Sequence, residues 1–382
     1  MRPVAFYSNH FAVKEGTGIA RYARNLVQAL AELDVPLSVV PVATWSNFDK
    51  NELKSVKTRT GLTILPTGRR FTQLLWLALG APKLERLLRT RIDIVHASTL
   101  GHLVATSKPY VVTVHDLGPL THPEFFRAAP SWFLKKHLDQ AIQEVDAFIC
   151  VSEATADALT AYVQREYSVD LSPRTHVVHE GVSESFLQPA NSSIPDSLGD
   201  FNLPQPYILA VGKLSPRKNL ESVIRALAQI RSVIPHHLVT VGGDGWDHEA
   251  IKALVHSHGL ADRVHFLGYV SDEALRTLYR RAALFIYPSL FEGFGLPVLE
   301  AMASGCPVIT SNISSLPEVA GNAALLVDPR NVEEIAGAIE AVCTSSSLAT
   351  ELRCKGQERA TLFSWQTCAT ETLVVYENVC VS

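Results

Sequence analysis

The sequence predicts an α/β protein made of two domains, each a doubly wound parallel sheet. Three observations lead to this prediction. Short β-branched apolar runs alternate with helix-length amphipathic stretches along the chain, as in parallel sheets covered by helices. A stretch rich in proline and small polar residues interrupts the alternation once, near the middle. The 382 residues provide for about two domains of ~150 residues, and 47% hydrophobic residues supply their cores.

The first predicted domain covers residues 1–185. Its apolar runs predict strands at residues 4–7, 37–42, 92–96, 110–114, 147–151 and 175–178. Amphipathic periodicity predicts helices at residues 19–31, 130–144 and 153–167. The strands are apolar on both faces, which is typical of a sheet buried between two layers of helices.

Residues 186–206 have the composition of a linker, and the second predicted domain covers residues 207–364. Its strands are predicted at residues 207–211, 237–241, 264–266, 284–287, 308–310 and 324–327. Its helices are predicted at residues 220–232, 246–258, 272–282, 297–304 and 332–344. Open parallel sheets bind ligands outside the carboxyl ends of their strands, so we expect a binding cleft between the two domains.

Composition and charge exclude several classes of protein. A net charge of −4 argues against a nucleic-acid binder, which normally carries a basic excess. Six cysteines without a C-x-x-C pair argue against a zinc site or a disulfide framework, and we expect reduced thiols in the cytoplasm. The first residues have too little apolar length for a signal peptide, and residues 74–82 are too few to cross a bilayer.

The most informative stretch follows the predicted strand at residues 284–287. It reads Glu292-Gly293-Phe294-Gly295-Leu296-Pro297, and Glu300 lies eight residues after Glu292. The glycines let a ligand approach the backbone, and the amides at the start of the following helix form an anion site. Carboxylates accept hydrogen bonds from sugar hydroxyls, so the stretch suits a diphosphate between two sugars. The alternative is a helix-capping loop with two surface glutamates.

A basic turn follows the first strand of the second domain. Gly212 ends this strand, and Lys213, Arg217 and Lys218 follow it. Cations at the carboxyl end of a strand can neutralise a departing diphosphate. A solvated basic turn is the usual alternative, and the glutamate stretch makes the functional interpretation the stronger one.

Two further segments of the first domain carry polar groups at strand ends. Gly16 and Gly18 follow the first strand, but one glycine of the dinucleotide fingerprint is missing, so NAD binding is poorly supported. His115 and Asp116 end a buried strand. His115 could form a hydrogen bond with a substrate hydroxyl. Asp116 could orient the imidazole of His115 or contact an acceptor. A structural histidine is the alternative.

Residues 69–91 and 132–137 combine aromatic, leucine and basic side chains. Such stretches are usually ordinary core helices with a solvated face. The alternative is that they lie on an anionic membrane surface, which leaves a peripheral contact with the inner membrane open.

Taken together, these motifs resemble glycosyltransferase family 4, whose members are retaining, nucleotide-sugar-dependent enzymes with the GT-B fold of two Rossmann-like domains. The resemblance rests on the two-glycine loop, the His-Asp pair and the glutamate stretch already described, together with 212–220 and 268–271. The amino-acid sequences at residues 217–220 and 314–321 look most similar to those of bacterial mannosyltransferases that build polysaccharide or O-antigen.

The resemblance implies a role for each charged residue. Lys218, with Arg217 or Lys213, would stabilise the diphosphate. Many members have an arginine where this chain has Lys213, which puts a bidentate phosphate contact at that position in doubt. Glu292 would contact the transferred sugar, and Glu300 would hold the ribose hydroxyls.

The resemblance also implies several backbone contacts with the donor. Amides around Phe294, Gly295 and Leu296 would bind the phosphates or the sugar. Tyr269 and Val270 would frame the base. Gly16 and Gly18 of the first domain would admit the diphosphate.

His115 would approach the sugar, and residues 365–382 would return as a helix to the first domain. The resemblance further implies a cytoplasmic enzyme acting on a glycan or lipid-linked acceptor. Its co-substrate would be a nucleotide-diphosphate sugar, with GDP-mannose favoured over UDP-glucose. No D-x-D pattern is placed to bind a metal, so we expect no metal and no other cofactor. Three rival functions are a sugar-nucleotide-binding protein without catalysis, a GT-B epimerase and a two-Rossmann dehydrogenase.

Overall fold

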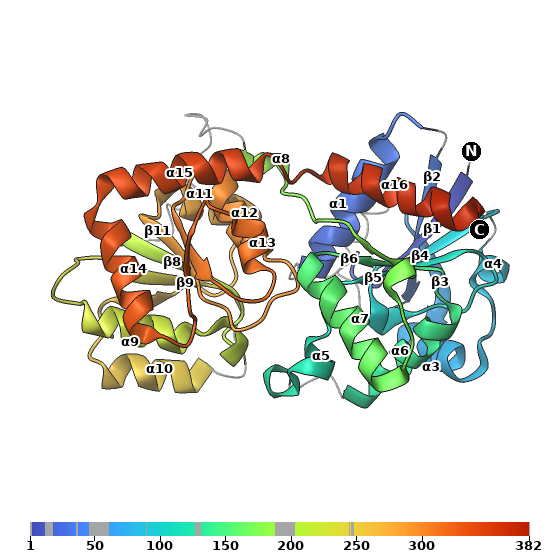
Figure 1. Ribbon diagram of the computed structural model, residues 1–382, viewed down its shortest axis with the longest axis horizontal. Helices are drawn as coiled ribbons and strands as arrows, with labels where there is room; N and C mark the ends of the chain where they lie inside the picture. Colours follow the sequence, from blue (N-terminus) through green and yellow to red (C-terminus); the bar gives the residue numbers. More distant parts are fainter. Residues whose placement is uncertain are drawn as a thin grey trace. The chain divides into compact units, whose positions relative to one another are not determined.

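The computed structural model describes residues 2–11, 18–35, 37–45, 61–88, 90–126, 131–187, 203–243, 245 and 248–381. The chain divides into two compact units (Figure 1). The first unit comprises Met1–Gly181 and Ser364–Ser382, and the second comprises Val182–Phe363. Most of the predicted linker, residues 188–202, lies outside the described residues.

The first unit is built on a seven-stranded parallel sheet in the order β3-β2-β1-β4-β5-β6-β7. Its strands are β1 (Arg2–Tyr7), β2 (Leu37–Trp45), β3 (Thr63–Gly68), β4 (Ile94–Ala97), β5 (Tyr110–Val114), β6 (Ala147–Cys150) and β7 (Thr175–Val177). Its α-helices are α1 (Gly18–Glu32), α3 (Arg69–Leu79), α4 (Leu84–Leu87), α5 (Gly118–Thr121), α6 (Ser131–Glu144), α7 (Glu153–Tyr167) and α16 (Trp365–Val381). Short 3-10 turns are η1 (Leu100–His102), η2 (Pro123–Phe125) and η3 (Ser172–Arg174).

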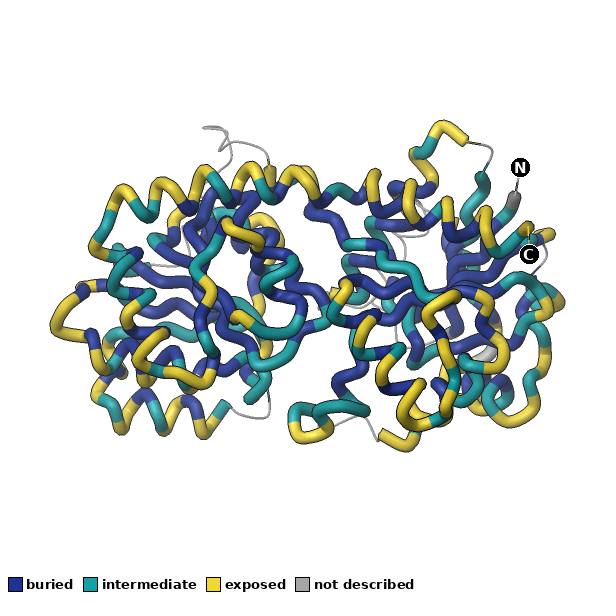
Figure 2. The backbone as a smooth tube through the Cα atoms, viewed as in Figure 1, coloured by how far each residue is buried: buried dark blue, intermediate teal, exposed yellow. Residues whose placement is uncertain are grey.

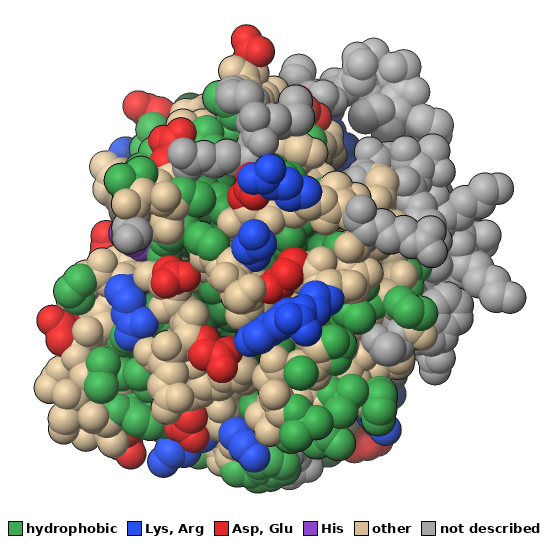
Figure 3. Space-filling view, turned by 90° about the vertical axis from the view of Figure 1, so that its right-hand side faces the viewer, with side chains coloured by type: hydrophobic (Ala, Val, Ile, Leu, Met, Phe, Trp, Pro, Cys, Tyr) green, Lys and Arg blue, Asp and Glu red, His purple; other side chains and the backbone are tan. Residues whose placement is uncertain are grey.

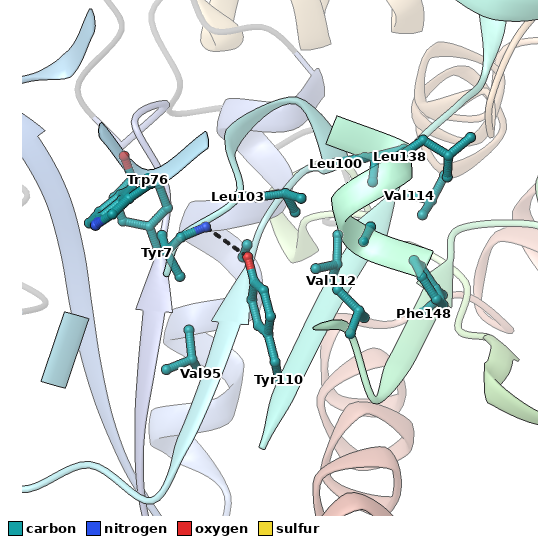
Figure 4. Close-up of a cluster of buried hydrophobic side chains, with 14 of the residues drawn as sticks. Tyr7, Trp76, Val95, Leu100, Leu103, Tyr110, Val112, Val114, Leu138 and Phe148 are labelled. Carbon is teal, nitrogen blue, oxygen red and sulfur yellow. Dashed lines mark hydrogen bonds between the residues drawn. The ribbon is translucent and has the colours of Figure 1, made fainter. Parts of the chain in front are cut away.

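One face of this sheet packs on α3, α6 and α7 through an apolar core, part of which Figure 4 shows. Tyr7 and Trp76 meet edge to face, with ring centroids 5.5 Å apart. The hydroxyl of Tyr110 is not left unpaired in this core, because it accepts a hydrogen bond of 2.9 Å from the backbone N–H of Val104.

The opposite face packs on α1 and α16 and contains a buried polar chain. The hydroxyl of Tyr376 on α16 lies 2.6 Å from Nδ1 of His96, and Nε2 of His96 lies 2.7 Å from Oγ1 of Thr113. The Thr113 hydroxyl in turn forms a hydrogen bond of 2.7 Å with the hydroxyl of Tyr22 on α1. Burial lowers the pKa of His96 to about 3, so the imidazole is neutral at pH 7 and can both donate and accept. This chain of bonds attaches the C-terminal helix to the first unit.

The second unit is built on a six-stranded parallel sheet in the order β10-β9-β8-β11-β12-β13. Its strands are β8 (Tyr207–Val211), β9 (His237–Val241), β10 (Val264–Phe266), β11 (Leu284–Tyr287), β12 (Val308–Ser311) and β13 (Leu325–Val327). Its helices are α8 (Glu184–Leu187), η4 (Pro216–Lys218), α9 (Leu220–Gln229), α10 (His248–Ser257), α11 (Asp272–Arg281), α12 (Leu296–Ala303), α13 (Leu316–Ala320), α14 (Val332–Thr344) and α15 (Ser346–Ala360). In both units the strands are buried and the outward helix surfaces are exposed (Figure 2).

Several elements were not among those predicted from the sequence, and strand β3 and helix α15 show why. Strand β3 was not predicted, because Pro66 interrupts its apolar run; β3 lies at the edge of its sheet, where a missing N–H is tolerated. Helix α15 was not predicted either, because its buried residues are Leu352, Gly356 and Ala360, a narrow stripe of mostly small side chains. A Cβ on Gly356 would lie 3.3 Å from the Met302 side chain, so the small residue permits close contact with α12. No described helix is long and apolar enough to span a membrane.

Candidate functional site

The candidate site of the second unit lies at the carboxyl ends of β8 and β11. These two strands are neighbours, and the chain proceeds from β8 towards one edge of the sheet and from β11 towards the other. At such a switch point the loops after the two strands diverge, which leaves room for a ligand. The basic turn follows β8 and the glutamate stretch follows β11, so the fold brings together the two motifs singled out in the sequence.

Glu292 joins both cations of the basic turn. Its Oε1 lies 2.6 Å from Nζ of Lys218, and its Oε2 lies 2.6 Å from Nη1 of Arg217. All three side chains are largely buried. Burial acts to raise the pKa of Glu292, but the charges and hydrogen bonds of Arg217 and Lys218 outweigh it and lower this pKa to about 2. The carboxylate is therefore ionised, and it holds two positive charges in fixed positions.

Tyr287, the last residue of β11, completes the surroundings of Lys218. The ammonium of Lys218 donates a hydrogen bond to the Tyr287 hydroxyl and lies 4.5 Å from the centre of its ring. Gly212, at φ +142°, lies beneath the lysine stem, and a Cβ there would be 3.0 Å from Cε of Lys218. A pocket lined in part by Gly212, Lys218, Thr240 and Tyr287 opens beside this group.

Asn219 fixes the position of the basic turn. It has φ +55°, in the left-handed region that asparagine tolerates, and it ends η4 immediately before α9. Its Nδ2 donates to the carbonyl oxygens of Pro288 at 3.0 Å and Pro329 at 2.6 Å. Its Oδ1 accepts a bond of 2.7 Å from the hydroxyl of Ser222. One buried side chain thus links the turn to the loops after β11 and β13.

Two serines before α13 fix the glutamate loop. Oγ of Ser314 accepts a hydrogen bond of 3.1 Å from the backbone N–H of Glu292 and donates one of 2.5 Å to its carbonyl. Oγ of Ser315 donates to the carbonyl of Phe294 at 2.6 Å. Gly295, at φ +122°, comes next, and a Cβ there would lie 2.8 Å from the Leu316 side chain. Only glycine fits this position without a shift.

The other residues of the second unit that were predicted to bind the nucleotide-sugar donor differ in how far they are buried. Glu300 lies inside α12 with 3% of its surface exposed, and the Tyr279 hydroxyl donates to its Oε2 at 3.4 Å. Phe294, Leu296 and Val270 are buried, so their side chains serve the core. Tyr269 is 53% exposed and Lys213 is exposed.

In the first unit the structure places the predicted residues as follows. His115 lies between two acceptors: its Nδ1 is 3.2 Å from Oε1 of Glu180, and its Nε2 is 3.0 Å from the carbonyl of Ser98. Asp116 accepts a hydrogen bond of 2.8 Å from the N–H of Gly118, and therefore caps a turn. Gly18 is the first residue of α1, and Gly16 lies outside the described residues.

Sequence reasoning missed the residues that hold the site in place. Tyr287 was predicted only as the last residue of a strand. Asn219, Ser314 and Ser315 were included only as parts of motifs that resemble the family. Glu180, the partner of His115, was not proposed as a site residue. Polar residues directly at or after strand ends were the available signal. Among the described residues, no group of three or more His, Cys, Asp or Glu side chains is placed to hold a metal ion.

Comparisons with known proteins agree with the family resemblance seen in the sequence. Residues 199–359 match a family model described as glycosyl transferases group 1, and residues 16–186 match one described as glycosyltransferase family 4. The chain is 32% identical over 293 residues to O-antigen chain mannosyltransferase B of Escherichia coli, covering 76% of each chain. It is 28% identical over 338 residues to O-antigen chain mannosyltransferase RfbU of Salmonella typhimurium, covering 85% of this chain and 90% of that protein. The Anabaena HepE structure in complex with UDP and glucose superposes with a TM-score of 0.77 at 19% identity, covering 99% and 100% of the two chains.

Proposed function

Because the chain is a glycosyltransferase that belongs to family 4, we propose that it transfers a hexose, with mannose favoured, from a nucleotide-diphosphate sugar to a glycan or glycolipid acceptor. The process would be the synthesis of a bacterial surface polysaccharide, since relatives over most of the chain are named O-antigen mannosyltransferases. The observation that carries the proposal is the buried cluster of Arg217, Lys218 and Glu292 at the switch point of the second sheet.

The cluster suits the chemistry of the leaving group. When the bond between the sugar and the diphosphate breaks, negative charge grows on the leaving phosphate. Lys218 and Arg217 are preorganised to stabilise this charge, because Glu292 contacts both cations and Tyr287 contacts Lys218 in a largely buried cluster. A diphosphate that takes over the two cations leaves the Glu292 carboxylate free to accept hydrogen bonds from hydroxyls of the transferred sugar.

We expect the transfer to retain the configuration at the anomeric carbon and to need no metal. In a same-face attack, the oxygen of the acceptor hydroxyl bonds the anomeric carbon as the bond to the diphosphate breaks. The leaving phosphate then takes the acceptor's proton. This course requires no carboxylate nucleophile. It requires fixed positive charge at the diphosphate, which Lys218 and Arg217 would supply in place of a metal ion.

A panel of nucleotide sugars tests the proposal. Release of nucleoside diphosphate is measured for GDP-mannose, UDP-glucose and related donors, with a glycan acceptor and with EDTA. We expect GDP-mannose to be used best, and Lys218→Ala to lower turnover by roughly a hundredfold or more. The matched control is Arg225→Ala, which removes an exposed cation that pairs with Glu221 on α9. A Lys218→Ala variant that stays folded with near-normal turnover would remove the cluster from the reaction, and an epimerised sugar formed without acceptor would identify an epimerase.

We also propose that the first unit touches a membrane surface peripherally. Helix α3 exposes Phe71, Leu74 and Leu79 by 61%, 64% and 70%, and Trp132 of α6 is 66% exposed. The face of this unit in Figure 3 has exposed hydrophobic side chains among Lys and Arg, with Asp and Glu interspersed. Helix α3 itself begins with Arg69 and Arg70, and basic residues beside exposed apolar ones favour anionic lipid. Sedimentation with anionic vesicles should bring the protein down, and a Phe71→Ser, Leu74→Ser double variant should stay in solution. Val233→Ser, at a 51% exposed position of the second unit, is the control. Equal sedimentation of the double variant would refute the contact.

A further inference from the structure

The switch point of the first sheet carries a pair of histidines that the proposed reaction has not used. The chain proceeds in opposite directions from β1 and β4, which are neighbours. His10 follows β1, and His102 ends η1, the turn after β4. Their ring centres are 5.3 Å apart and their planes differ by 32°. In an open parallel sheet this is the place where a ligand is expected, as in the second unit.

One ring nitrogen of the pair and a nearby hydroxyl lack hydrogen-bond partners in the part of the chain that the structure describes. Nδ1 of His102 is buried, and no described group bonds it. Oγ of Ser98, directly after β4, is likewise buried without a partner. Buried polar atoms in native proteins almost always have a partner in protein, water or ligand. Two such atoms after the same strand therefore indicate a bound group at the carboxyl end of β4.

Arg69 is the permanent cation among the groups that act on the pair. Burial, followed by the charges of His115 and Arg69, lowers the pKa of His10 to about 4. Burial, followed by the charges of His10, Arg69 and His137, lowers the pKa of His102 to about 3. Among the described residues, the groups whose charges act on the two rings include no carboxylate. Arg69 is exposed at the start of α3, directly after β3. It therefore lies, like the pair, at the carboxyl ends of the strands.

We propose that His10, His102 and Arg69 form a subsite for a phosphoryl group carried by the acceptor. This inference rests on the proposed function, because it names the chemical class of the acceptor. Arg69 supplies a planar cation that can bond two phosphate oxygens. Each neutral imidazole keeps one N–H that can donate to a further oxygen. Neutral sugar hydroxyls would gain more from carboxylates, and none is among the described groups whose charges act on this pair.

Binding of inorganic phosphate tests the subsite directly. The nucleotide site is first saturated with nucleoside diphosphate, so that phosphate cannot occupy Arg217 and Lys218. NMR signals of the histidine rings are then followed during the titration and assigned with His10→Gln and His102→Gln. We expect saturable shifts of the His10 and His102 signals, with affinity reduced roughly tenfold to a hundredfold in Arg69→Gln. Arg91→Gln, which removes an exposed arginine that pairs with Asp93, should bind as the wild type does.

The same variants are then compared in transfer assays with three acceptors: a hexose 1-phosphate, its neutral methyl glycoside, and the hexose linked through diphosphate to a short prenyl chain. Preference for either phosphorylated acceptor, with an acceptor KM that rises in Arg69→Gln while the donor KM stays constant, supports the subsite. Use of the soluble phosphate points to a free sugar phosphate, and use of the prenyl form alone points to a lipid-linked one.

Two results overturn the inference. One is the absence of ring shifts, and the other is an effect of Arg69→Gln that is equal for charged and neutral acceptors. In either case, transfer to the neutral acceptor leaves the proposed function standing. Failure of the proposed function is a separate result, because it appears as the absence of transfer to every acceptor and the absence of donor turnover.

Discussion

Replacing Asn219 separates the two ways in which this residue holds the basic turn. Its side chain makes three buried hydrogen bonds, to Pro288, Pro329 and Ser222, and its backbone is left-handed at φ +55°. Asn219→Gly removes the bonds but suits the backbone. Three bonds at about 1 kcal/mol each predict a loss of about 3 kcal/mol. Asn219→Ala also strains the backbone by about 1–2 kcal/mol, partly offset by the greater freedom that glycine has in the unfolded chain. The alanine variant should thus be about 0.5–1 kcal/mol less stable than the glycine variant.

The measurement is chemical and thermal unfolding of the second unit, followed for wild type and both variants. A loss of about 3 kcal/mol corresponds to a fall of roughly 6–12 °C in the unfolding temperature of a unit this size. Asn219→Asp keeps an oxygen for Ser222 but places a carboxylate oxygen against two carbonyl acceptors, so it should be less stable than Asn219→Gly. The reasoning is refuted if alanine is tolerated as well as glycine, or if either costs less than about 1 kcal/mol.

Three further predictions concern other groups. Because the folded-state pKa of Glu292 is depressed, its contribution to stability is present above its ordinary pKa of 4.5 and should be lost as the pH falls from there towards 2. Acid titration of unfolding should show this loss in wild type, and an equal loss in Glu292→Gln would contradict it. Tyr376→Phe should cost about 1–3 kcal/mol, because it leaves Nδ1 of buried His96 unpaired; urea unfolding of the first unit measures the loss, and an unchanged midpoint would contradict it. Glu300→Ala should weaken nucleotide binding in calorimetry, and unchanged affinity in a folded variant would exclude a contact with the ribose.

Elements with a strong periodic pattern were predictable from the sequence. Strands such as 207–211 and 237–241 were predicted at the residues where the structure has them, because both faces are apolar and β-branched. The helix at 153–167 begins after Ser152, whose side chain accepts a bond from the N–H of Thr155, as a cap should. Strand β3 escaped prediction because only its edge position makes Pro66 acceptable, and edge positions are not written in a local pattern.

The charges of the site were predictable as a set but not as a geometry. The resemblance of the sequence motifs to the family placed Arg217, Lys218 and Glu292 in one site, with the cations at the diphosphate and the carboxylate at the sugar. The structure adds that Glu292 bonds both cations. It likewise shows that both nitrogens of His115 meet acceptors, one of which, Glu180, is 65 residues away along the chain.

The sequence by itself determined the parallel α/β architecture and the loops in which the reactive groups stand, because local periodicity and turn residues encode both. The tertiary structure alone decided how closely these loops approach and which of their atoms make contact. Lys218 and Glu292 are 74 residues apart in the chain and 2.6 Å apart in space. Their contact depends on β8 pairing with β11, and this pairing is set by how helices pack across the whole sheet rather than by any local pattern.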